Sequence, residues 1–541
     1  MPITPTYPGI YIEELPSHSH AIAAAPTSIT VFVGYTHPYK TKNFNHAVQL
    51  FSFADYEREF GGLYTSGVFD SNVASAVMQY FVNGGSVAYV IGLQPKFYRD
   101  LSGTITGTPD ATDPLFPASP TPRPKLTLGG IVFRALEPTD GATMSVTINN
   151  PQPSDPATPA TKDVADIIIT YGSRIETFRR VTINPNPVNA ADKANYIETR
   201  INGVSSLVTV SPNNAAPPLY GTTITTSAIP STFNAGLPAD LSTTFSEGDF
   251  IPVFQQDTTL DKISIFNLLL VPGVADNSVW SAALAFCERK QAFVIMDPPR
   301  DAAADPSSAP LKTMADEMDN VVPKSPNGAI YFPYLNSQDP LTGNAVELPP
   351  SGFVAGIFAR TDTNRGVWKA PAGLETTVLN TTGVVSRGRM TDMRQGTLNQ
   401  KGVNCLRSFP GIGTVVYGAR TLVSENVAFQ QWKYVPVRRM ALFIEQTLYR
   451  NLGWVVFEPN DEPLWIAIRT SIENFMLSLF NQGAFQGTKP SQAFLVQCDK
   501  STTTQTDVDN GIVNVVVGFA PLKPAEFVIV KIAQLAGQVQ S

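Results

Sequence analysis

Three short motifs contain residue types that bind nucleotides or metals. Gly411–Gly413, with Gly418 downstream, has the glycines of a dinucleotide loop but the wrong spacing and no clear helix after it. Asp507–Gly511 begins like a calcium loop, but its glycine comes too early and no glutamate stands at the twelfth position. His18 and His20 would need a third metal ligand from elsewhere. We interpret the first two motifs as turns and the histidine pair as solvated.

Residues for catalysis are also scarce. There is no Gly-x-Ser-x-Gly elbow, no His-Glu-x-x-His motif and no phosphate loop with Gly-Lys-Ser/Thr. The chain has only 4 histidines. We therefore predict no catalytic residues, no metal site and no cofactor, and a protein that is not an enzyme.

A run of cations is the one charged feature that could bind a partner. Within it, the only acid is Asp392, and the cations are Arg387, Arg389, Arg394, Lys401 and Arg407. This stretch is either a solvated loop or a patch that meets an acidic partner. Arg438 and Arg439 begin a predicted helix, where cations oppose the helix dipole. Either an external acidic partner or a local salt bridge would offset that conflict.

Composition limits the classes of protein that remain. At 541 residues the chain should form three or four domains. Charged residues make up 15%, against a usual share of about 25%, which indicates either a surface largely covered by partners or an abundance of Thr/Ser-rich loops. The net charge of −7 argues against nucleic-acid binding. Three scattered cysteines predict no disulfide framework, and neither a secretory signal nor a membrane-spanning run is visible.

Patterning along the chain predicts an α/β (α+β) multidomain fold. A core of mixed sheets with helices is interrupted by a mostly β inserted domain, and extended strand arms lie at both ends. The expected parts are an N-terminal arm (1–26), the first core part (27–96), the insert (97–254), the second core part (255–400), a C-terminal α/β domain (401–524) and a C-terminal arm (525–541).

The C-terminal third has the clearest helical periodicity. Apolar residues at steps of three and four predict a helix from about Val437 to Leu452, and a second one follows a cap at Asn460 or Asp461. A helix through Lys290 is expected to begin at a Ser278 cap. Four runs are strand-like and predict a small α/β sandwich with the two helices: Trp454–Phe457, Ala493–Cys498, Ile512–Phe519 and Glu526–Ile532.

The two ends of the chain have strand composition without local partners. Tyr7–Glu14 is rich in β-branched and aromatic residues, and the prolines around it suit an edge strand. An unpaired strand exposes backbone donors and acceptors, which a strand of another chain can satisfy. Glu526–Ile532 is the C-terminal counterpart, with an internal strand of the last domain as the alternative.

Taken together, these motifs resemble those of the contractile tail sheath proteins of bacteriophages, R-type tailocins and extracellular contractile injection systems. The similarity covers about residues 1–95 and 255–535, and the insert has no counterpart in it. The matching segments, in order, are Tyr7–Glu14, Pro26–Ser28, Phe32–Gly34, Phe266–Gly273, Val354–Gly356, Ala359–Asp362, Arg365–Ala372, Leu398–Asn399, Gly402–Asn404, Gly418–Leu422, Arg438–Arg439, Phe457–Asn460 and Ala520–Phe527.

The resemblance implies a subunit of a helical sheath around an inner tube, which polymerises in a metastable extended state and contracts to drive the tube through an envelope. It implies that terminal strands are lent to neighbouring subunits. The N-arm residues are Tyr7, Ile10, Tyr11 and Ile12, and the C-arm residues are Phe527, Val528, Ile529, Val530 and Ile532. Candidate contacts with the tube or a neighbour are Arg387, Arg389, Arg394, Lys401, Arg438 and Arg439.

The implied partners are further copies of the chain, the inner tail tube protein, and baseplate and tail terminator or cap proteins, with no nucleic acid and no membrane insertion. Assembly in the bacterial cytoplasm is expected, as part of a phage tail or a released extracellular particle. The C-terminal domain should face inward and the insert outward. Alternatives are a type VI-like secretion sheath recycled by an ATPase, an α/β enzyme, and, from residues 97–250 alone, a secreted β-rich adhesin.

Overall fold

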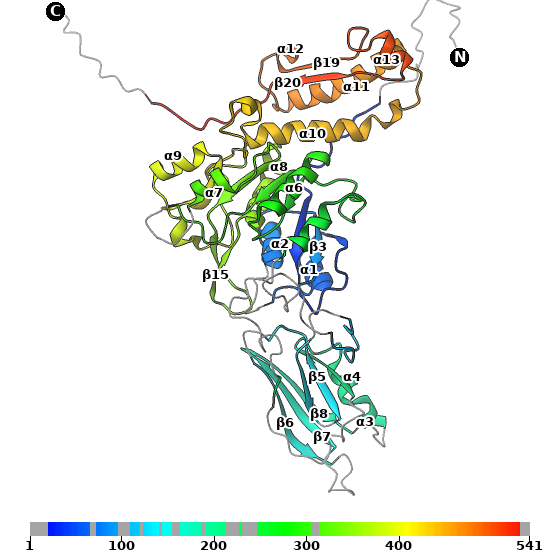
Figure 1. Cartoon of the computed structure of the whole chain (residues 1–541), viewed down its shortest axis with the longest axis vertical. Coiled ribbons are helices and arrows are strands. Elements are labelled where there is room, and N and C mark those ends of the chain that lie inside the picture. Colours follow the sequence, from blue (N-terminus) through cyan, green and yellow to red (C-terminus); the bar gives the residue numbers. More distant parts are fainter. Residues whose placement is uncertain are drawn as a thin grey trace, which may run out of the picture.

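The chain folds into three bodies stacked along one long axis (Figure 1). A computed structural model describes residues 20–64, 72–95, 109–118, 123–128, 130–139, 143–153, 163–184, 190–212, 227–229, 246–304 and 313–530. The insert lies at one end, an α/β body lies in the middle, and two long helices with a small sheet form the other end. The predicted α+β fold is confirmed.

The middle body is built on an eight-stranded sheet with the order β18-β17-β13-β12-β11-β1-β3-β2. Its inner strands are parallel, and β2 and β18 are antiparallel edges. Buried Val, Ile and Leu on both faces suit a sheet covered on two sides. The strands are β1 (Thr30–Tyr35), β2 (Ala47–Leu50), β3 (Ala88–Leu93), β11 (Leu268–Leu270), β12 (Phe293–Met296), β13 (Gly328–Phe332), β17 (Val403–Phe409) and β18 (Gly413–Val416).

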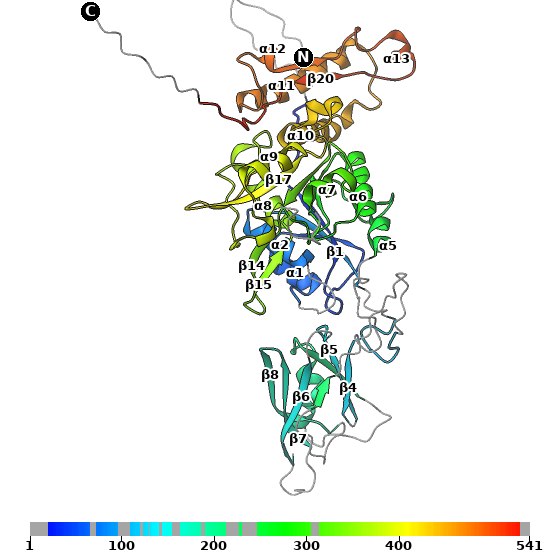
Figure 2. The ribbon, with the colours of Figure 1, turned by 60° about the vertical axis from the view of Figure 1, so that its left-hand side comes forward.

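Helices cover both faces of this sheet, and Figure 2 separates the two layers. One layer consists of α1 (Phe53–Phe60), α2 (Asn72–Val82) and α8 (Ser351–Arg365). The other consists of α6 (Asn277–Arg289), α7 (Met314–Asn320) and α9 (Asp392–Gln400). A small sheet of β15 (Ala345–Leu348), β14 (Leu335–Gln338) and β16 (Gly383–Val384) lies beside α8.

Two glycines let α8 lie directly on α2. A Cβ atom at Gly352 would come within 2.5 Å of the Ala76 carbonyl oxygen. At Gly356 it would come within 2.6 Å of both the Tyr80 carbonyl oxygen and the Asn83 Cβ. Because the neighbouring atoms are mostly backbone, they cannot move aside cheaply, so this helix pair depends on the missing side chains.

Gly356→Ala is therefore expected to lower the free energy of unfolding by about 1–3 kcal/mol, the usual effect of overpacking. Gly396→Ala in α9 is the matched control, because a Cβ there meets nothing within 4 Å. That change should stabilise its helix by up to about 1 kcal/mol. Thermal melts of the two variants should move in opposite directions, and a shared direction would contradict the role of close packing.

The insert is a β-sandwich with its own buried core, as the sequence predicted for a mostly β domain. One sheet has the order β4-β5-β9 and the other the order β10-β6-β7-β8. β4 and β5 form an antiparallel hairpin in which Leu128 lies opposite Ile131. The elements are β4 (Lys125–Leu128), β5 (Ile131–Ala135), β6 (Met144–Gln152), β7 (Val164–Tyr171), β8 (Arg174–Thr182), α3 (Ala190–Ala194), α4 (Ile197–Ile201), β9 (Val208–Pro212) and β10 (Ser227–Ile229). The chain re-enters the middle body through α5 (Glu247–Phe250) and the 3-10 helix η2 (Ile251–Phe254).

A buried ion cluster joins the insert to the middle body. Glu137 of the insert faces the middle body's His37 (Nε2 to Oε2, 3.2 Å) and Lys40, and also pairs with Arg174 (Nη1 to Oε1, 3.2 Å). Burial alone would raise the pKa of Glu137, but these cationic and hydrogen-bonding partners hold it at about 2. Glu137 is therefore ionised at neutral pH and ties the two bodies together.

The third body packs α10 (Val435–Asn451) antiparallel to α11 (Glu462–Asn481), with β19 (Phe494–Gln497) and β20 (Val516–Phe519) alongside (Figure 1). Both helices have the predicted apolar faces. Asp461 is the cap of α11, since its carboxylate accepts from the Leu464 amide at 3.2 Å. The remaining short elements are η3 (Ser386–Gly388), η4 (Val427–Trp432), η5 (Gly453–Val455), α12 (Pro490–Ala493) and α13 (Gln505–Asp509).

Four local expectations were wrong. Asp276, not Ser278, caps α6. Trp454–Phe457 is not a strand, because the chain turns through η5 to connect the two helices. The expected sandwich has only the strands β19 and β20 within the described residues, and Glu526–Val530 is unpaired there. The domain boundary expected at residue 400 falls inside the middle body, because β17 and β18 continue the sheet of that body.

Candidate assembly surface: an open sheet and two anchored chain ends

The small sheet of the third body consists of two antiparallel strands. Phe494 lies opposite Phe519, and Gln497 lies opposite Val516. Within the described residues, neither outer edge is paired with a further strand. Leu495 is 51% exposed and Val516 is 47% exposed. Since a two-stranded sheet is marginal by itself and open edges attract strands, this sheet is suited to receive strands from outside.

The N-terminal segment is fastened along α10 before it enters β1. Asn451 bonds both backbone groups of Ala23, at 3.0 and 2.9 Å, and the Thr447 hydroxyl accepts from the Ala25 amide at 3.1 Å. Two residues of extended chain advance about 6.6 Å, and four helical residues about 6 Å, so the two spacings match. The His20 ring stacks on Trp454 at 4.1 Å between centroids. His20 therefore lies near the C-terminal end of α10.

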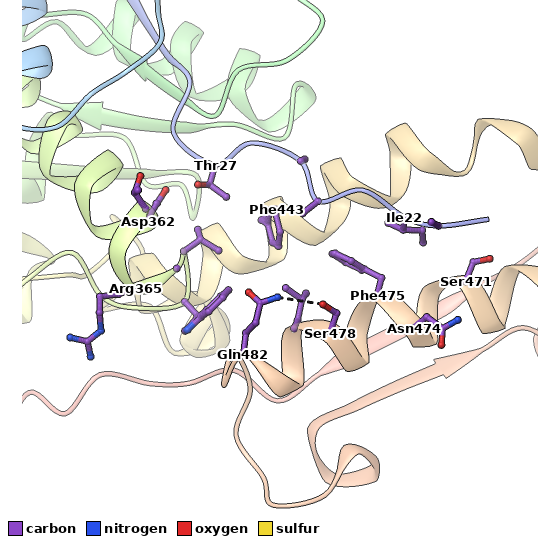
Figure 3. A pocket seen from close by; sticks show the side chains of 18 of the residues that line it. Ile22, Thr27, Asp362, Arg365, Phe443, Ser471, Asn474, Phe475, Ser478 and Gln482 are labelled. Atoms are coloured by element: carbon purple, nitrogen blue, oxygen red, sulfur yellow. Dashed lines mark hydrogen bonds between the residues drawn. The ribbon is translucent and has the colours of Figure 1, made fainter. Parts of the chain in front are cut away.

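A cavity of about 900 Å³ lies beneath this segment (Figure 3). Phe443 of α10 and Phe475 of α11 form an apolar wall, and Asp362 and Arg365 at the end of α8 lie across from them. The cavity thus separates the N-terminal segment from α11. It lies where the three helices α8, α10 and α11 meet.

Among the described residues, the C-terminal segment (residues 522–530) is held at Glu526. Arg420 donates from Nε and Nη2 to the two carboxylate oxygens of Glu526, at 2.9 and 2.6 Å. Tyr434 donates its hydroxyl to the same carboxylate at 3.4 Å, and Arg420 also donates to the Asn399 carbonyl at 2.8 Å. Beyond Glu526 the side chains of Phe527, Val528, Ile529 and Val530 are 75–82% exposed. We call the Arg420–Glu526 pair the C-terminal clamp, because it fixes where the arm begins.

Glu526→Ala should release this segment. The pair is charge-assisted, bidentate and mostly shielded, so its loss is expected to speed chymotryptic cleavage after Leu522 by about tenfold. Glu375→Ala is the control, since Glu375 is 65% exposed in its pair with Arg365 and should change cleavage little. Mass spectrometry of timed digests measures both rates, and equal rates in the two variants would show that the clamp does not hold the segment.

Most of the predicted cationic candidates are paired within the chain. Arg387 is bidentate to Glu347, Lys401 binds Asp319, and Arg407 binds Asp392. These three cations are therefore ion-paired and largely shielded within the chain, and the stretch is not a loop, because it contains α9 and the start of β17. Arg389 and Arg394 remain exposed.

The two arginines at the start of α10 bind groups of the same chain. Arg438 donates to the Asn327 side chain at 3.0 Å and lies 3.5 Å from Glu445. Arg439 pairs with Asp362, with side chains 3% and 2% exposed. The local salt bridge is thus the correct alternative for Arg439, and a buried side chain offers no surface to a tube.

Of the arm residues, Phe527, Val528, Ile529 and Val530 lie in the described part, extended and exposed. Five arm residues lie outside the described residues: Tyr7, Ile10, Tyr11, Ile12 and Ile532.

Sequence reasoning missed both anchors of the chain ends. Thr447 and Asn451, two polar residues four positions apart on α10, were the signal available for one of them. No pattern in the sequence indicated the C-terminal clamp, because Arg420 and Glu526 are 106 residues apart.

Asp297 is a buried carboxyl group at the carboxyl end of a parallel strand, where α/β enzymes place catalytic groups. Burial raises its pKa to about 6. Ser351 donates to it from its amide (2.8 Å) and hydroxyl (2.6 Å), and the Gly273 amide donates at 2.9 Å. These bonds join β11, β12 and the start of α8, which is a structural role. The part of the chain that the structure describes holds no cluster of metal-binding side chains and no helix able to span a membrane.

Comparison with solved structures gives the same fold. The sheath of an extracellular contractile injection system, PVC, in its contracted state matches with a TM-score of 0.56 and 22% identity over 98% of each chain. The helical sheath of the anti-feeding prophage in its contracted state gives 0.54 and 22%, over 98% of this chain and all of that one. These likenesses extend over the whole length and show that the fold is that of sheath subunits.

Sequence comparison identifies the family. Residues 258–422 match the phage tail sheath protein central domain, and residues 428–534 match the phage tail sheath C-terminal domain. The tail sheath protein of Vibrio phage KVP40 is 26% identical over 33% of this chain and 25% of its own length. A prophage major tail sheath protein of Pseudomonas aeruginosa is 26% identical over 49% of this chain and 65% of its own. The chain belongs to the contractile tail sheath family, and the matches span between a quarter and two thirds of these curated relatives.

Proposed function

We propose that this chain is the structural subunit of a helical contractile sheath. The observation that carries the proposal is the combination of an open two-stranded sheet with chain ends that leave from fixed anchors. An arm and a receiving sheet on one chain make a heterologous contact, and such a contact repeats into a helical filament when it does not close. The arms then keep subunits linked while their folded bodies rotate.

Burial of the C-terminal arm supplies part of the assembly energy. Its four exposed apolar side chains would each contribute roughly 1.5–3 kcal/mol when fully covered by a neighbour. Backbone pairing with an open sheet edge adds direction and register. No nucleotide is required, because contraction releases energy that was stored when the extended sheath assembled.

The partners in this proposal are further copies of the chain, an inner tail tube protein, and baseplate and terminator or cap proteins. Assembly takes place in the bacterial cytoplasm, and the sheath forms part of a phage tail or a released particle. The C-terminal body faces the tube and the insert faces outward. Arg389 and Arg394, which are exposed, are candidates for contact with a tube or neighbour. Because both family domains lie on one chain, a single-chain sheath is favoured over a type VI-like sheath made from two chains.

Negative-stain microscopy of the purified full chain tests the proposal. We expect hollow helical tubes at high protein concentration and, in the presence of tube and baseplate proteins, sheaths of two lengths. Material that stays monomeric at every concentration would contradict a sheath.

A further inference from the structure

The loop between α10 and α11 holds a large apolar side chain in water. Phe457 is fully exposed, and its neighbour Val456 is 63% exposed. The backbone at Phe457 has a φ of 72°, in the left-handed region that a bulky residue rarely adopts. Among the described residues, the fully exposed ring is covered by no other group that would offset this conformation. Such a residue is typical of a contact made with another molecule.

The loop is held rigidly around this residue. Asn460 donates to the Ile512 carbonyl at 3.0 Å and accepts from the Trp465 indole at 2.8 Å. Asp461 caps α11 directly afterwards. Phe457 is therefore presented in a fixed position, which reduces the entropy lost when it binds.

Acidic residues flank the exposed ring. Glu458 is exposed and has no ion-pair partner among the described residues. Asp461 and Glu462 follow it on the surface, and Glu462 lies 3.5 Å from Lys500. We call residues 455–462 the acidic loop. Its partner surface should be an apolar hollow with cations at its edge.

A groove of about 1130 Å³ on the same chain has this character. Its apolar lining comes from Trp368, Leu374, Phe409, Tyr417, Leu522 and Phe527. Of the lining cations, Arg365 and Arg407 are paired with Glu375 and Asp392. Lys369 and Lys523 have no carboxylate partner in the part of the chain that the structure describes, and this leaves the groove with an excess of positive charge.

The acidic loop and the groove lie at opposite ends of the α10–α11 pair. The loop follows the C-terminal end of α10, whereas Gln482 and Gly483, just after α11, line the groove. With 17 residues, α10 separates the two surfaces by about 25 Å. One subunit cannot bring its own loop to its own groove, but neighbouring subunits in a row can.

We propose that the acidic loop of one subunit docks into this groove of the next, with Phe457 in the apolar hollow and Glu458 facing Lys369 and Lys523. The inference rests on the proposed sheath function and names one contact within it. The contact is separate from the strand exchange of the arms, although Phe527, where the C-terminal arm begins, forms part of the groove wall. A docked loop therefore covers the start of the arm.

Phe457→Asn tests the apolar half of the contact. Asparagine tolerates the left-handed backbone, so thermal stability of the monomer should be unchanged or slightly higher. The protein concentration needed for tube formation, measured by pelleting and microscopy, should rise about tenfold or more, as for a central interface aromatic. Phe51→Asn is the matched control, because Phe51 is 63% exposed but lies away from both surfaces. It should assemble like the wild type.

Charge reversal tests the pairing. Glu458→Lys alone, and Lys369→Glu with Lys523→Glu, should each weaken tube formation, and the three changes together should restore it. A merely structural role for either surface would not give this rescue. If the wild type forms tubes but Phe457→Asn assembles equally well, or if the triple variant stays defective, the docking is overturned while the sheath function stands. A wild type that never assembles overturns both.

Discussion

A chain that lacks residues 1–19 should fold normally yet fail to form a sheath that contracts as one body. The cut falls before His20, so the stacking on Trp454 and the bonds from Asn451 and Thr447 to the N-terminal segment are retained. The monomer keeps every contact among the residues that the structure describes and should melt at the wild-type temperature. What it loses, in our proposal, is the strand that would be lent to a neighbour, and with it the link that would persist while the folded bodies move.

A matching deletion of residues 527–541 leaves the C-terminal clamp intact and removes the exposed apolar run. Because that run can bury four large side chains, its loss should raise the concentration needed for assembly by more than about 100-fold. Pelleting and microscopy measure assembly, and thermal melts check folding. Normal contraction by the chain without residues 1–19 would refute the role of its arm.

The helices of the C-terminal body could be predicted from sequence because α10 and α11 are long and strongly periodic, and local pattern decides such elements. The short apolar run Trp454–Phe457 was misread because an apolar run of that length fits a strand or a turn equally well. The strand order of the middle body's sheet could not be predicted from the hydrophobic pattern. β1 pairs with β11, although more than 200 residues, including the whole insert, separate them in sequence.

The anchors of the chain ends show the same limit. Arg420 and Glu526 both lie within segments that resemble sheath proteins, but nothing in their spacing indicates that they meet. Arg439 was recognised as a cation in conflict with the dipole of its helix. Only the fold reveals that Asp362, 77 residues earlier, resolves the conflict. Sequence thus identifies the charged group that needs a partner, and the tertiary structure supplies the partner.

The ion pair between Arg439 and Asp362 gives the largest expected effect on stability. Arg439 donates to Asp362 from Nη1 at 2.9 Å and from Nη2 at 2.6 Å, and Nη2 also donates to the Thr27 carbonyl at 2.9 Å. Its guanidinium lies 4.7 Å from the centre of the Phe358 ring. Arg439→Met leaves Asp362 buried without a partner, so the free energy of unfolding should fall by about 3–5 kcal/mol. Arg365→Met in α8, the helix that carries Asp362, breaks an exposed pair and should cost at most about 1 kcal/mol.

The double variant Arg439→Met with Asp362→Leu separates the charge from the packing. If the loss in the single variant comes from a stranded carboxylate, replacing both partners with apolar side chains should recover most of the stability in thermal melts. A double variant as unstable as the single one would assign the effect to lost packing instead. The Thr27 carbonyl loses its donor in both variants. Recovered stability with weakened tube formation would therefore show that Arg439 also serves assembly, by fixing the N-terminal segment between α8 and α10 at the point where its arm begins.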